Sequence, residues 1–379
     1  MKILGIETSC DETALSLVEA TGDFTQNFRF AVLGERLVSQ AAMHAEYGGV
    51  FPNLAKREHA KNLVPLLEAV LGDAKMLQLG HSPTIDLGAL LVREPELLEQ
   101  LVPFLAHYEK PPIDALAVTN GPGLEPALWV GVNFAKALAV AWDLPIIAVN
   151  HMEGHIVMSL VTEDGLNDVS YPVLALLVSG GHTELVLSAA LGEYRRLGAT
   201  RDDAAGEAFD KIARLLDLPY PGGPEISRLA SDARSAGLEA IPFTSPMLRS
   251  DDLDFSFSGL KTEVRRLVEK ESPTVEMKKR IALGVENAIS TVLVEKTARA
   301  ADSYGVHTAI VGGGVSANEH IRRELAQRLE MQDCTLLAPS PALATDNARM
   351  IALAGYTRAL KKEFTEPKNL VAAGDLKLG

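Results

Sequence analysis

Two histidines four residues apart, His151 and His155, are the residue pair in this sequence best suited to metal chemistry. Residues four apart lie on one face of an α-helix, so both imidazoles can reach one ion. Two neutral imidazoles need a third ligand, commonly a carboxylate, to complete a face with open positions. The spacing indicates a metal site, with two unrelated histidines near a helix start as the alternative.

A candidate carboxylate is Asp346, in the segment 344–347 just before a helix expected over 348–360. An aspartate at this place is by default the N-cap of the helix. A cap position at a cleft could instead direct the side chain at a metal, so both interpretations stay open.

Glu153, between the two histidines, excludes the zinc-peptidase interpretation. That motif is HExxH, in which the acid directly follows the first histidine. Here the acid comes two residues after His151, which is a rotation of about 200° on a helix. We therefore expect Glu153 to point away from a metal held by the histidines.

Glycine-containing loops are candidates for phosphate or nucleoside binding, because small residues let backbone N–H groups approach a ligand. One loop is Gly312–Gly314, followed by residues 315–318, and another is Ser179–Gly181. Neither matches the Walker or the GxGxxG pattern. A tight turn before a helix and a hairpin turn are their structural alternatives.

Three further residues could carry chemistry. Asp210 lies in the first turns of a helix that begins at Ala205 and that we expect to end at 220–224. Its carboxylate could accept a hydrogen bond from a ribose hydroxyl, or it could be a solvated residue near a helix start. Cys10 has no histidine and acid at a recognisable spacing, so a small buried thiol is expected. Ser179 lacks the GxSxG elbow, which argues against a serine hydrolase.

The composition is that of an acidic globular protein. The chain has 379 residues, which suggests two domains, and a formal net charge of −14, which argues against nucleic-acid binding without partner subunits. Its basic clusters read as solvated helix faces: 195–196, 261–266, 278–280 and 322–323. Disorder is expected only after Glu363.

Cellular location is also constrained. The two cysteines form no CxxC pair, and the first eleven residues lack the features of a signal peptide. The most apolar stretch, 130–149, is broken by Lys136, Asp143 and Pro145 and reads as a helix followed by a strand rather than a membrane span. We expect a cytoplasmic protein.

The order of elements repeats within the chain. Strand 3–6, turn 9–13 and strand 14–18 are matched by strand 173–178, turn 179–183 and strand 184–187. Strand 115–119, a Gly loop and helix 127–140 are matched by strand 308–311, a Gly loop and helix 318–329. This predicts two duplicated α/β lobes with a ligand cleft between them.

The domain boundaries follow from the repeat. We expect a first lobe over 1–165, completed by a C-terminal helix within 346–379, and a second lobe over 166–345, with the boundary near 164–170. The Pro-bearing segment 72–112, with a probable helix over 94–107, interrupts the repeat and reads as an insertion.

Together these segments resemble the TsaD family of tRNA threonylcarbamoyltransferases over nearly the whole chain. The motifs that carry the resemblance are 5–13, 47–50, 57–59, 121–124, 151–155, 177–183, 206–211, 220–224, 255–261, 312–318 and 345–348. The resemblance implies the actin, sugar-kinase and heat-shock-chaperone (ASKHA) fold, with a nucleotide and metal cleft between lobes.

The resemblance also implies roles for residues. His151, His155 and Asp346 would hold one divalent metal ion, with iron as the first candidate and zinc as the second. Asp11 and Glu12 match positions at the reaction centre. The substrate contacts of the family fall on Leu177, Val178, Ser179, Gly180, Gly181, Asp210, Gly223 and Asn318.

The activity so implied moves a threonylcarbamoyl group from threonylcarbamoyl-AMP to the N6 amine of adenosine 37, in the anticodon loop of tRNAs reading codons that begin with A, and releases AMP. Expected partners are an inactive paralogue and a small P-loop ATPase. Departures from the family pattern, at 24–30, 72–94 and 125–126, lie in the first lobe. An ATP-dependent kinase or ATPase of the same superfamily and a non-catalytic scaffold remain alternatives.

Overall fold

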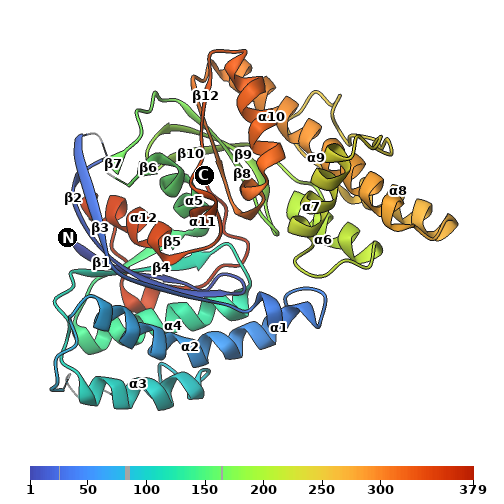
Figure 1. Ribbon diagram of the computed structural model, residues 1–379. Helices are drawn as coiled ribbons and strands as arrows, with labels where there is room; N and C mark the ends of the chain where they lie inside the picture. The colour runs from blue at the N-terminus through green and yellow to red at the C-terminus, as the bar shows by residue number, and fades with distance from the viewer. Residues whose placement is uncertain (25, 82–85, 164) are drawn as a thin grey trace. The chain divides into compact units, whose positions relative to one another are not determined.

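The computed structural model describes residues 1–24, 26–81, 86–163 and 165–379, which form two compact units (Figure 1). Unit 1 comprises residues 1–41, 50–167 and 346–378, and unit 2 comprises 42–49, 168–345 and 379. Residue 25 of the expected hairpin extension, residues 82–85 of the expected insertion and residue 164 of the expected boundary lie outside the described residues.

Unit 1 is built on a five-stranded mixed sheet in the order β3-β2-β1-β4-β5. Its strands are β1 (Lys2–Glu7), β2 (Glu12–Asp23), β3 (Gln26–Ser39), β4 (Ala115–Gly121) and β5 (Ile146–Asn150). β1, β2 and β3 are joined as antiparallel neighbours, whereas β4 pairs parallel to β1 and β5 pairs parallel to β4. The carboxyl ends of β1, β4 and β5 therefore meet at one edge of the sheet.

Helices cover both faces of this sheet. They are α2 (Pro52–Asp73), α3 (Pro95–His107), α4 (Glu125–Trp142), α5 (His151–Leu160) and α12 (Ala348–Leu360). Unit 1 also contains a small two-stranded sheet, β6 (Val161–Thr162) and β7 (Gly165–Leu166), and the short 3-10 helix η2 (Pro367–Asn369). Figure 1 shows α2, α3 and α4 on one side of the sheet and α12 on the other. The apolar residues Leu4, Leu17 and Leu116 are fully buried in one core cluster with residues of α2, α3 and α4.

Two glycines set how closely α12 approaches its neighbours. A Cβ on Gly5 of β1 would lie 2.3 Å from the carbonyl oxygen of Ala348, and a Cβ on Gly154 of α5 would lie 3.0 Å from Cγ of Met350. A larger residue at position 5 would meet backbone and force the start of α12 away from β1, whereas one at position 154 would meet side chains that have to shift slightly. These contacts place the residues just before α12 beside α5.

Unit 2 has a sheet of the same plan, in the order β10-β9-β8-β11-β12. Its strands are β8 (Val173–Val178), β9 (Thr183–Ala190), β10 (Glu193–Ala199), β11 (Thr308–Gly312) and β12 (Thr335–Leu337). β8, β9 and β10 are antiparallel neighbours, and β11 and β12 pair in parallel from β8 outward. Both sheets thus share strand order and strand directions, which confirms the duplicated α/β fold predicted from the sequence repeat.

The helices of unit 2 are more numerous than those of unit 1. They are α6 (Ala205–Leu215), α7 (Gly222–Ser235), α8 (Ser258–Lys270), α9 (Val275–Tyr304), η1 (Gly314–Ala317), α10 (Glu319–Glu330) and α11 (Pro341–Ala344), with most of α1 (Ala41–Ala45). α9 supplies much of the core, where Ile281, Ile289 and Leu293 are fully buried against residues of α6, α7 and β8.

Two expectations about the course of the chain are wrong. The helix that begins at Ala205 ends at Leu215 rather than at 220–224, and Gly222 instead starts α7 after Pro221. The helix expected over 318–329 is confirmed as α10, and a 3-10 turn, Gly314–Ala317, precedes it.

The second concerns the tail after Glu363, which is ordered along unit 1 rather than disordered. The backbone N–H of Thr365 donates to the carbonyl of Ile146 at 2.8 Å, and that of Ala373 donates to Asn120 at 2.8 Å. Leu370 is only 1% exposed. The tail completes the packing around β4 and β5, which a reading of local composition could not anticipate.

Candidate functional site

The carboxyl ends of three neighbouring parallel strands bring together the polar residues of unit 1. Glu7 is the last residue of β1, Thr119 lies near the end of β4, and His151 directly follows β5. The parallel register, with Ile6 opposite Val118 and Thr119 opposite Val149, aligns these ends. Loops and side chains outside the carboxyl ends of such strands are the usual ligand sites of α/β folds.

The two histidines occupy the first turn and a half of α5. The helix begins at His151 because the side chain of Asn150 caps it, accepting a hydrogen bond from the backbone N–H of Met152 at 2.9 Å. His151 and His155 are 5% and 2% exposed, and their ring centroids are 4.8 Å apart at an interplanar angle of 86°. The prediction that both imidazoles share one face of a helix is confirmed.

Asp346 lies against both rings. Its Oδ1 is 3.3 Å from Nε2 of His151 and 3.2 Å from Nε2 of His155. The N-cap of α12 is Asn347, whose side chain accepts a hydrogen bond from the backbone N–H of Met350 at 3.0 Å. The interpretation of Asp346 as the N-cap is therefore wrong, since the next residue fills that role and leaves the aspartate directed at the histidines.

The three side chains have the composition and spacing of a metal site. Two imidazole nitrogens and one carboxylate oxygen lie within 4.8 Å of one another. Nε2 of His155 is buried and, among the described residues, has no hydrogen-bond partner of good geometry. A buried nitrogen without such a partner is costly unless an ion takes its lone pair, so the group fits a two-histidine, one-carboxylate centre.

The charges of the group stabilise one another. Burial by itself lowers the pKa of His151, but the carboxylates of Asp346 and Glu7 outweigh it and hold that pKa well above its ordinary value. Burial likewise raises the pKa of Asp346, but the charge and hydrogen bond of His151 and the charge of His155 outweigh it and hold the pKa well below its usual range. The carboxylate is therefore ionised and available as a ligand at any ordinary pH.

Glu153 faces elsewhere, as expected from its position on the helix. Its Oε2 accepts a hydrogen bond from Nε of Arg358, on α12, at 2.7 Å. The side chain is 1% exposed and forms a buried ion pair. It serves the packing of α5 on α12 rather than the group formed by His151, His155 and Asp346.

The turn from β1 to β2 carries Asp11 and Glu12. Asp11 is 8% exposed, and Oε1 of Glu12 accepts a hydrogen bond from the hydroxyl of Ser39 at 3.3 Å. Burial, together with the charges of Asp346 and Asp11, raises the pKa of Glu12 to about 9. Glu12 is accordingly protonated at neutral pH in the metal-free protein.

Cys10, in the same turn, is half-buried, and burial with the nearby charges of Asp11 and Asp346 raises the pKa of its thiol well above the usual value. A thiol held in this way is a poor nucleophile. His59, on α2, contacts both ends of this turn. Its Nε2 is 3.0 Å from the carbonyl oxygen of Cys10, and its Nδ1 is 2.8 Å from the hydroxyl of Thr13.

In unit 2 the equivalent turn, between β8 and β9, is made of small residues. The backbone N–H of Ser179 donates to the carbonyl of His182 at 2.8 Å, and the Ser179 hydroxyl accepts from the His182 N–H at 3.1 Å. Gly180 and Gly181 are exposed, and a Cβ on either would meet no atom within 4 Å. The turn thus presents its backbone to the surroundings. Leu177 and Val178, by contrast, are buried within β8.

Two other segments of unit 2 lie directly against this turn. The N–H of Gly206, at the start of α6, donates to the carbonyl of Ser179 at 3.2 Å. A Cβ on Gly313, in the loop after β11, would lie 2.5 Å from the carbonyl oxygen of Val178. The Gly-rich loop and the hairpin turn therefore form one glycine-lined surface at the carboxyl ends of β8 and β11.

Asp210 joins two helices. Its Oδ1 accepts hydrogen bonds from the N–H of Gly222 at 2.7 Å and from that of Gly223 at 3.3 Å, at the start of α7. The interpretation of Asp210 as a merely solvated residue is therefore wrong. A carboxylate at this helix start satisfies backbone donors that would otherwise be unpaired.

Asn318 is held on both sides of its amide. Its Oδ1 accepts from the N–H of Ile321 at 3.0 Å and caps α10, while its Nδ2 donates to Oε1 of Glu286 at 2.7 Å. Glu286, on α9, is fully buried and also pairs with Arg234 on α7 at 2.6 Å. Helices α7, α9 and α10 are thereby tied together around the side chain of Asn318.

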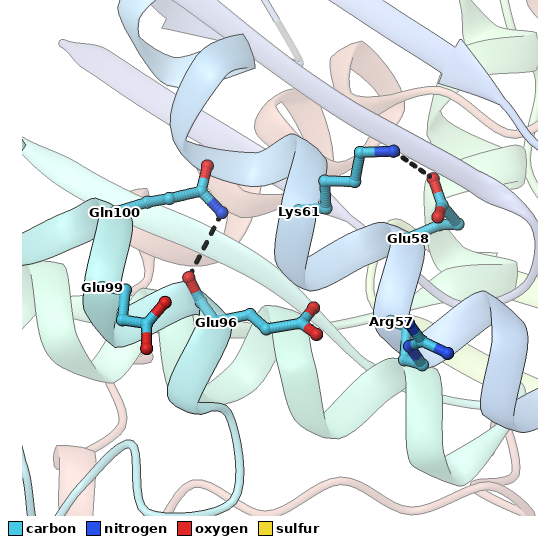
Figure 2. Close-up of a pocket in the computed structure, with 6 residues that line it drawn as sticks. All are labelled: Arg57, Glu58, Lys61, Glu96, Glu99 and Gln100. Atoms are coloured by element: carbon cyan, nitrogen blue, oxygen red, sulfur yellow. Dashed lines mark hydrogen bonds and ion pairs between the residues drawn. The ribbon is translucent and has the colours of Figure 1, made fainter.

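A pocket of about 350 Å³ lies between α2 and α3, lined by Arg57, Glu58, Lys61, Glu96, Glu99 and Gln100 (Figure 2). Lys61 pairs with Glu58 at 3.5 Å, and the side-chain amide of Gln100 donates to the carbonyl of Glu96 at 3.2 Å. The lining is charged and mixed in sign, and none of the residues singled out as catalytic, substrate-binding or metal-binding takes part in it.

Sequence reasoning missed the buried residues that support these groups. They are Glu7, Thr119 and His59 in unit 1 and Glu286 in unit 2. Glu7 could have been noticed as an acid closing an apolar strand, and Glu286 as an acid in the apolar middle of a long helix. Nothing local in the sequence indicates which residues they contact.

Comparison with known proteins agrees with this architecture. The chain matches the family model described as "TsaD: tRNA N6-adenosine threonylcarbamoyltransferase" over residues 31–78 and 97–353. It is 40% identical over 358 residues to a protein of Nitrosomonas europaea named tRNA N6-adenosine threonylcarbamoyltransferase, covering 94% of this chain and 93% of that protein. The matched ranges leave out residues 79–96, which fall within the expected insertion.

Two solved structures share the fold. One is HypF of T. kodakarensis, with a TM-score of 0.50 and 14% identity over 73% of this chain and 44% of that chain. The other is full-length HypF in a phosphate- and nucleotide-bound form, with a TM-score of 0.50 and 13% identity over 95% of this chain and 55% of that chain. At this identity the likeness concerns the fold alone. Among the described residues, no helix is both long and apolar enough to cross a membrane.

Proposed function

Because this chain belongs to the TsaD family of tRNA N6-adenosine threonylcarbamoyltransferases, we propose that it transfers a threonylcarbamoyl group from threonylcarbamoyl-AMP to the N6 amine of adenosine 37 of tRNA. The tRNAs concerned are those that read codons beginning with A. The observation that carries this proposal is the group of His151, His155 and Asp346, which family membership alone did not guarantee in this chain.

His151, His155 and Asp346 would hold one divalent ion, with iron as the first candidate and zinc as the second. Bound there, the ion would supply Lewis-acid polarisation and a template for oxygen atoms of the threonylcarbamoyl group. The protein supplies a rigid seat for it, since all three ligands are buried or half-buried and are positioned by capped helices.

The reaction is an acyl transfer in which each bond is accounted for. The N6 nitrogen of adenosine forms a bond to the carbamoyl carbon, and the bond from that carbon to the phosphate oxygen breaks. AMP leaves with the electron pair, and the amine nitrogen gives up one proton. Because this amine is a weak nucleophile, holding it in line with the activated carbonyl supplies several kcal/mol of the acceleration.

Asp11 and Glu12 are the proposed residues at the reaction centre. Burial and the charges of Asp346 and Asp11 raise the pKa of Glu12 to about 9 in the protein without a metal, and a cation held by Asp346 would oppose that shift. We assign to Asp11 or Glu12 the orientation of the amine or the acceptance of its proton. The half-buried, protonated thiol of Cys10 takes no part.

The adenylate part of the donor is assigned to unit 2. Exposed backbone at Gly180, Gly181 and Gly314 would receive the phosphate, with the half-buried Ser179 beside it and with Asp210, Gly223 and Asn318 nearer the nucleoside. Since Leu177 and Val178 are buried in β8, their contribution is to fix the start of the turn. Backbone donors beside a helix start suit an anionic ligand.

Two alternatives predict different behaviour. A kinase-like ATPase of the same fold would turn over ATP without tRNA and would have no use for the two histidines. A non-catalytic scaffold would not need to keep His151, His155 and Asp346 in ligand geometry. The observed group therefore favours the transferase.

Partners and location complete the proposal. With a net charge of −14, the chain needs help from partner subunits to hold an anticodon loop. The partners that the family resemblance implies, and that we propose, are an inactive paralogous subunit and a small P-loop ATPase. We propose a cytoplasmic location, where tRNA and the adenylate are made. We also propose two domains. The first comprises residues 1–165 together with 346–379 and contains an insertion over 72–112, and the second comprises residues 166–345.

The test is the transfer of labelled threonylcarbamoyl from its adenylate to an unmodified tRNA transcript, with and without the proposed partners. We expect transfer by the wild-type protein and none by His151→Ala. Turnover of ATP without tRNA, and no transfer by folded, metal-loaded protein under any partner condition, would refute the transferase and favour the ATPase.

A further inference from the structure

Glu7 is a fully buried carboxylate at the end of β1, with 0% of its surface exposed. Three groups contact it. Its Oε1 accepts from the backbone N–H of Ser9 at 2.5 Å, and its Oε2 accepts from the hydroxyl of Thr119 at 2.6 Å and lies 3.1 Å from Nδ1 of His151. Burying a carboxylate is costly unless hydrogen bonds and an opposite charge compensate it, so this arrangement calls for a function.

The charge partner of Glu7 sets it apart from the other buried glutamates of the described chain. Glu94 pairs with Lys56, Glu153 with Arg358 and Glu286 with Arg234. The ion-pair partner of Glu7 is instead a histidine, and that histidine belongs to the metal-ligand group. A glutamate needed only for packing would be better compensated by a permanent cation.

The two nitrogens of His151 face two different carboxylates. Nδ1 lies 3.1 Å from Oε2 of Glu7 and 3.2 Å from the hydroxyl of Ser9, which can accept or donate, and Nε2 lies 3.3 Å from Oδ1 of Asp346. An ionised carboxylate can only accept, so the contact at Nδ1 requires the proton of the neutral ring to lie on that nitrogen. The lone pair of the ring is then on Nε2, the nitrogen that points to the shared ligand position.

We propose that Glu7 is a positioning residue of the metal centre, which holds His151 in the tautomer and ring orientation that a metal ligand needs. The inference rests on the metal centre of the proposed function and assigns a role that neither the sequence motifs nor the family match provides. The hydroxyl of Thr119 and the N–H of Ser9 each donate a hydrogen bond to one oxygen of Glu7. These bonds position the carboxylate of Glu7, which in turn orients the imidazole of His151.

The substitution that tests this is Glu7→Gln, which preserves side-chain volume. The Ser9 N–H would keep the amide oxygen on its side, which turns the amide NH2 toward Nδ1 of His151 and favours the tautomer that cannot ligate through Nε2. Partners of this kind typically change metal affinity by about 10- to 100-fold. Thr119→Val removes one support of Glu7 and leaves its charge in place, so we expect the same change to a smaller degree.

The measurement is Zn²⁺ and Co²⁺ affinity of the full chain, by competition with a chromophoric chelator, together with the visible absorption spectrum of the Co²⁺ form. Glu153→Gln is the matched control, because it alters an equally buried glutamate of α5 that pairs with Arg358. We expect weaker binding and an altered Co²⁺ spectrum for Glu7→Gln and wild-type values for Glu153→Gln.

Each outcome decides the matter. Wild-type affinity and spectrum in both Glu7→Gln and Thr119→Val overturn the positioning role and leave the metal centre intact. Equal losses in Glu7→Gln and Glu153→Gln overturn it as well, since the effect would then be one of packing. If Glu7→Gln fails to fold, Thr119→Val decides by the same criteria. Undiminished binding by His151→Ala would refute the metal centre itself, which separates its failure from that of Glu7.

Discussion

The two units share a sheet order and strand directions, yet the same turn carries different chemistry in each. In unit 1 the turn after β1 holds Asp11 and Glu12, next to a buried glutamate and two histidines. In unit 2 the turn after β8 holds Gly180 and Gly181, with open space around both. One copy therefore offers side chains for a cation, and the other offers exposed backbone for an anionic ligand.

Each copy also buries one glutamate with no exposed surface. Glu7 contacts His151 in unit 1, and Glu286 contacts Asn318 in unit 2. The comparison teaches that duplication of a backbone fixes where a ligand can bind, at the carboxyl ends of parallel strands. The side chains at those ends, and the buried groups behind them, decide which ligand it is.

The largest expected effect separates the two units by function. His155→Ala removes a proposed ligand, and we expect Zn²⁺ affinity to fall by more than about 100-fold because a ligand should matter more than its supporting partners. AMP affinity, assigned to unit 2, should stay unchanged. Chelator competition and calorimetry with AMP measure the two. A loss of both would mean that the units do not bind their ligands separately.

A second pair of substitutions compares two glycines within unit 2. Gly313→Ala should lower the free energy of unfolding by about 1–3 kcal/mol, because Gly313 has a φ of 88° and a Cβ there would lie 2.5 Å from the carbonyl oxygen of Val178. Gly180→Ala should change it by less than about 0.5 kcal/mol, since a Cβ there meets nothing.

Gly180→Ala should nevertheless weaken AMP binding if the phosphate approaches the backbone at this turn. Chemical denaturation gives the stabilities of both variants, and calorimetry gives the AMP affinities. Unchanged AMP affinity in a stable Gly180→Ala protein would remove this turn from the proposed phosphate site.

Metal binding by unit 1 should depend on pH. A protonated imidazole cannot bind a metal, and the pKa of His151 is raised by Asp346 and Glu7 despite burial. Protons should therefore begin to compete above the ordinary histidine pKa of about 6.5, so Zn²⁺ affinity should fall steadily as the pH is lowered from about 8 to about 6. Asp346, whose pKa is lowered, stays ionised throughout.

Chelator competition at several pH values checks this, and AMP binding by the same samples serves as the control. Zn²⁺ affinity that is flat over this range would contradict the assignment of His151 as a ligand held between two carboxylates.

The smallest expected effect concerns the buried glutamate of unit 2. Glu286→Gln keeps the volume but weakens the pairing with Arg234 and loosens the amide of Asn318. AMP affinity should therefore fall by about 3- to 10-fold, which corresponds to about one neutral hydrogen bond. In an Asn318→Ala background the same change should have no further effect on AMP affinity. An undiminished effect in that background would show that Glu286 acts by another route.

Much of the architecture could be predicted because it depends on local patterns. The apolar strands, the turns between them and the repeat of strand, Gly loop and helix are all visible within short windows. The helical spacing of His151 and His155 likewise determines that they share a face. The helix expected over 348–360 is confirmed, whereas the helix that begins at Ala205 ends at Leu215 and a second helix starts after Pro221, which composition did not predict.

The residues of the candidate site could be predicted from the family resemblance. The contacts among them could not, because they join residues far apart in the sequence. Tertiary packing brings Asp346 against two histidines nearly 200 positions away and brings Glu7 against His151. It also joins Asp210 to Gly222 and Glu286 to Asn318. Residue type alone allowed a cap, a solvated acid or a ligand at these positions.

By itself the sequence determined the duplicated strand order, the glycine positions and the shared face of the two histidines, because hydrophobic periodicity and backbone preference act over a few residues. Only the tertiary structure decided that Asp346 lies against the two histidines, that Glu7 contacts Nδ1 of His151, and that Asn347 is the N-cap of α12. Those outcomes depend on how closely α12 approaches β1 and α5, which Gly5 and Gly154 permit and no short window of sequence reveals.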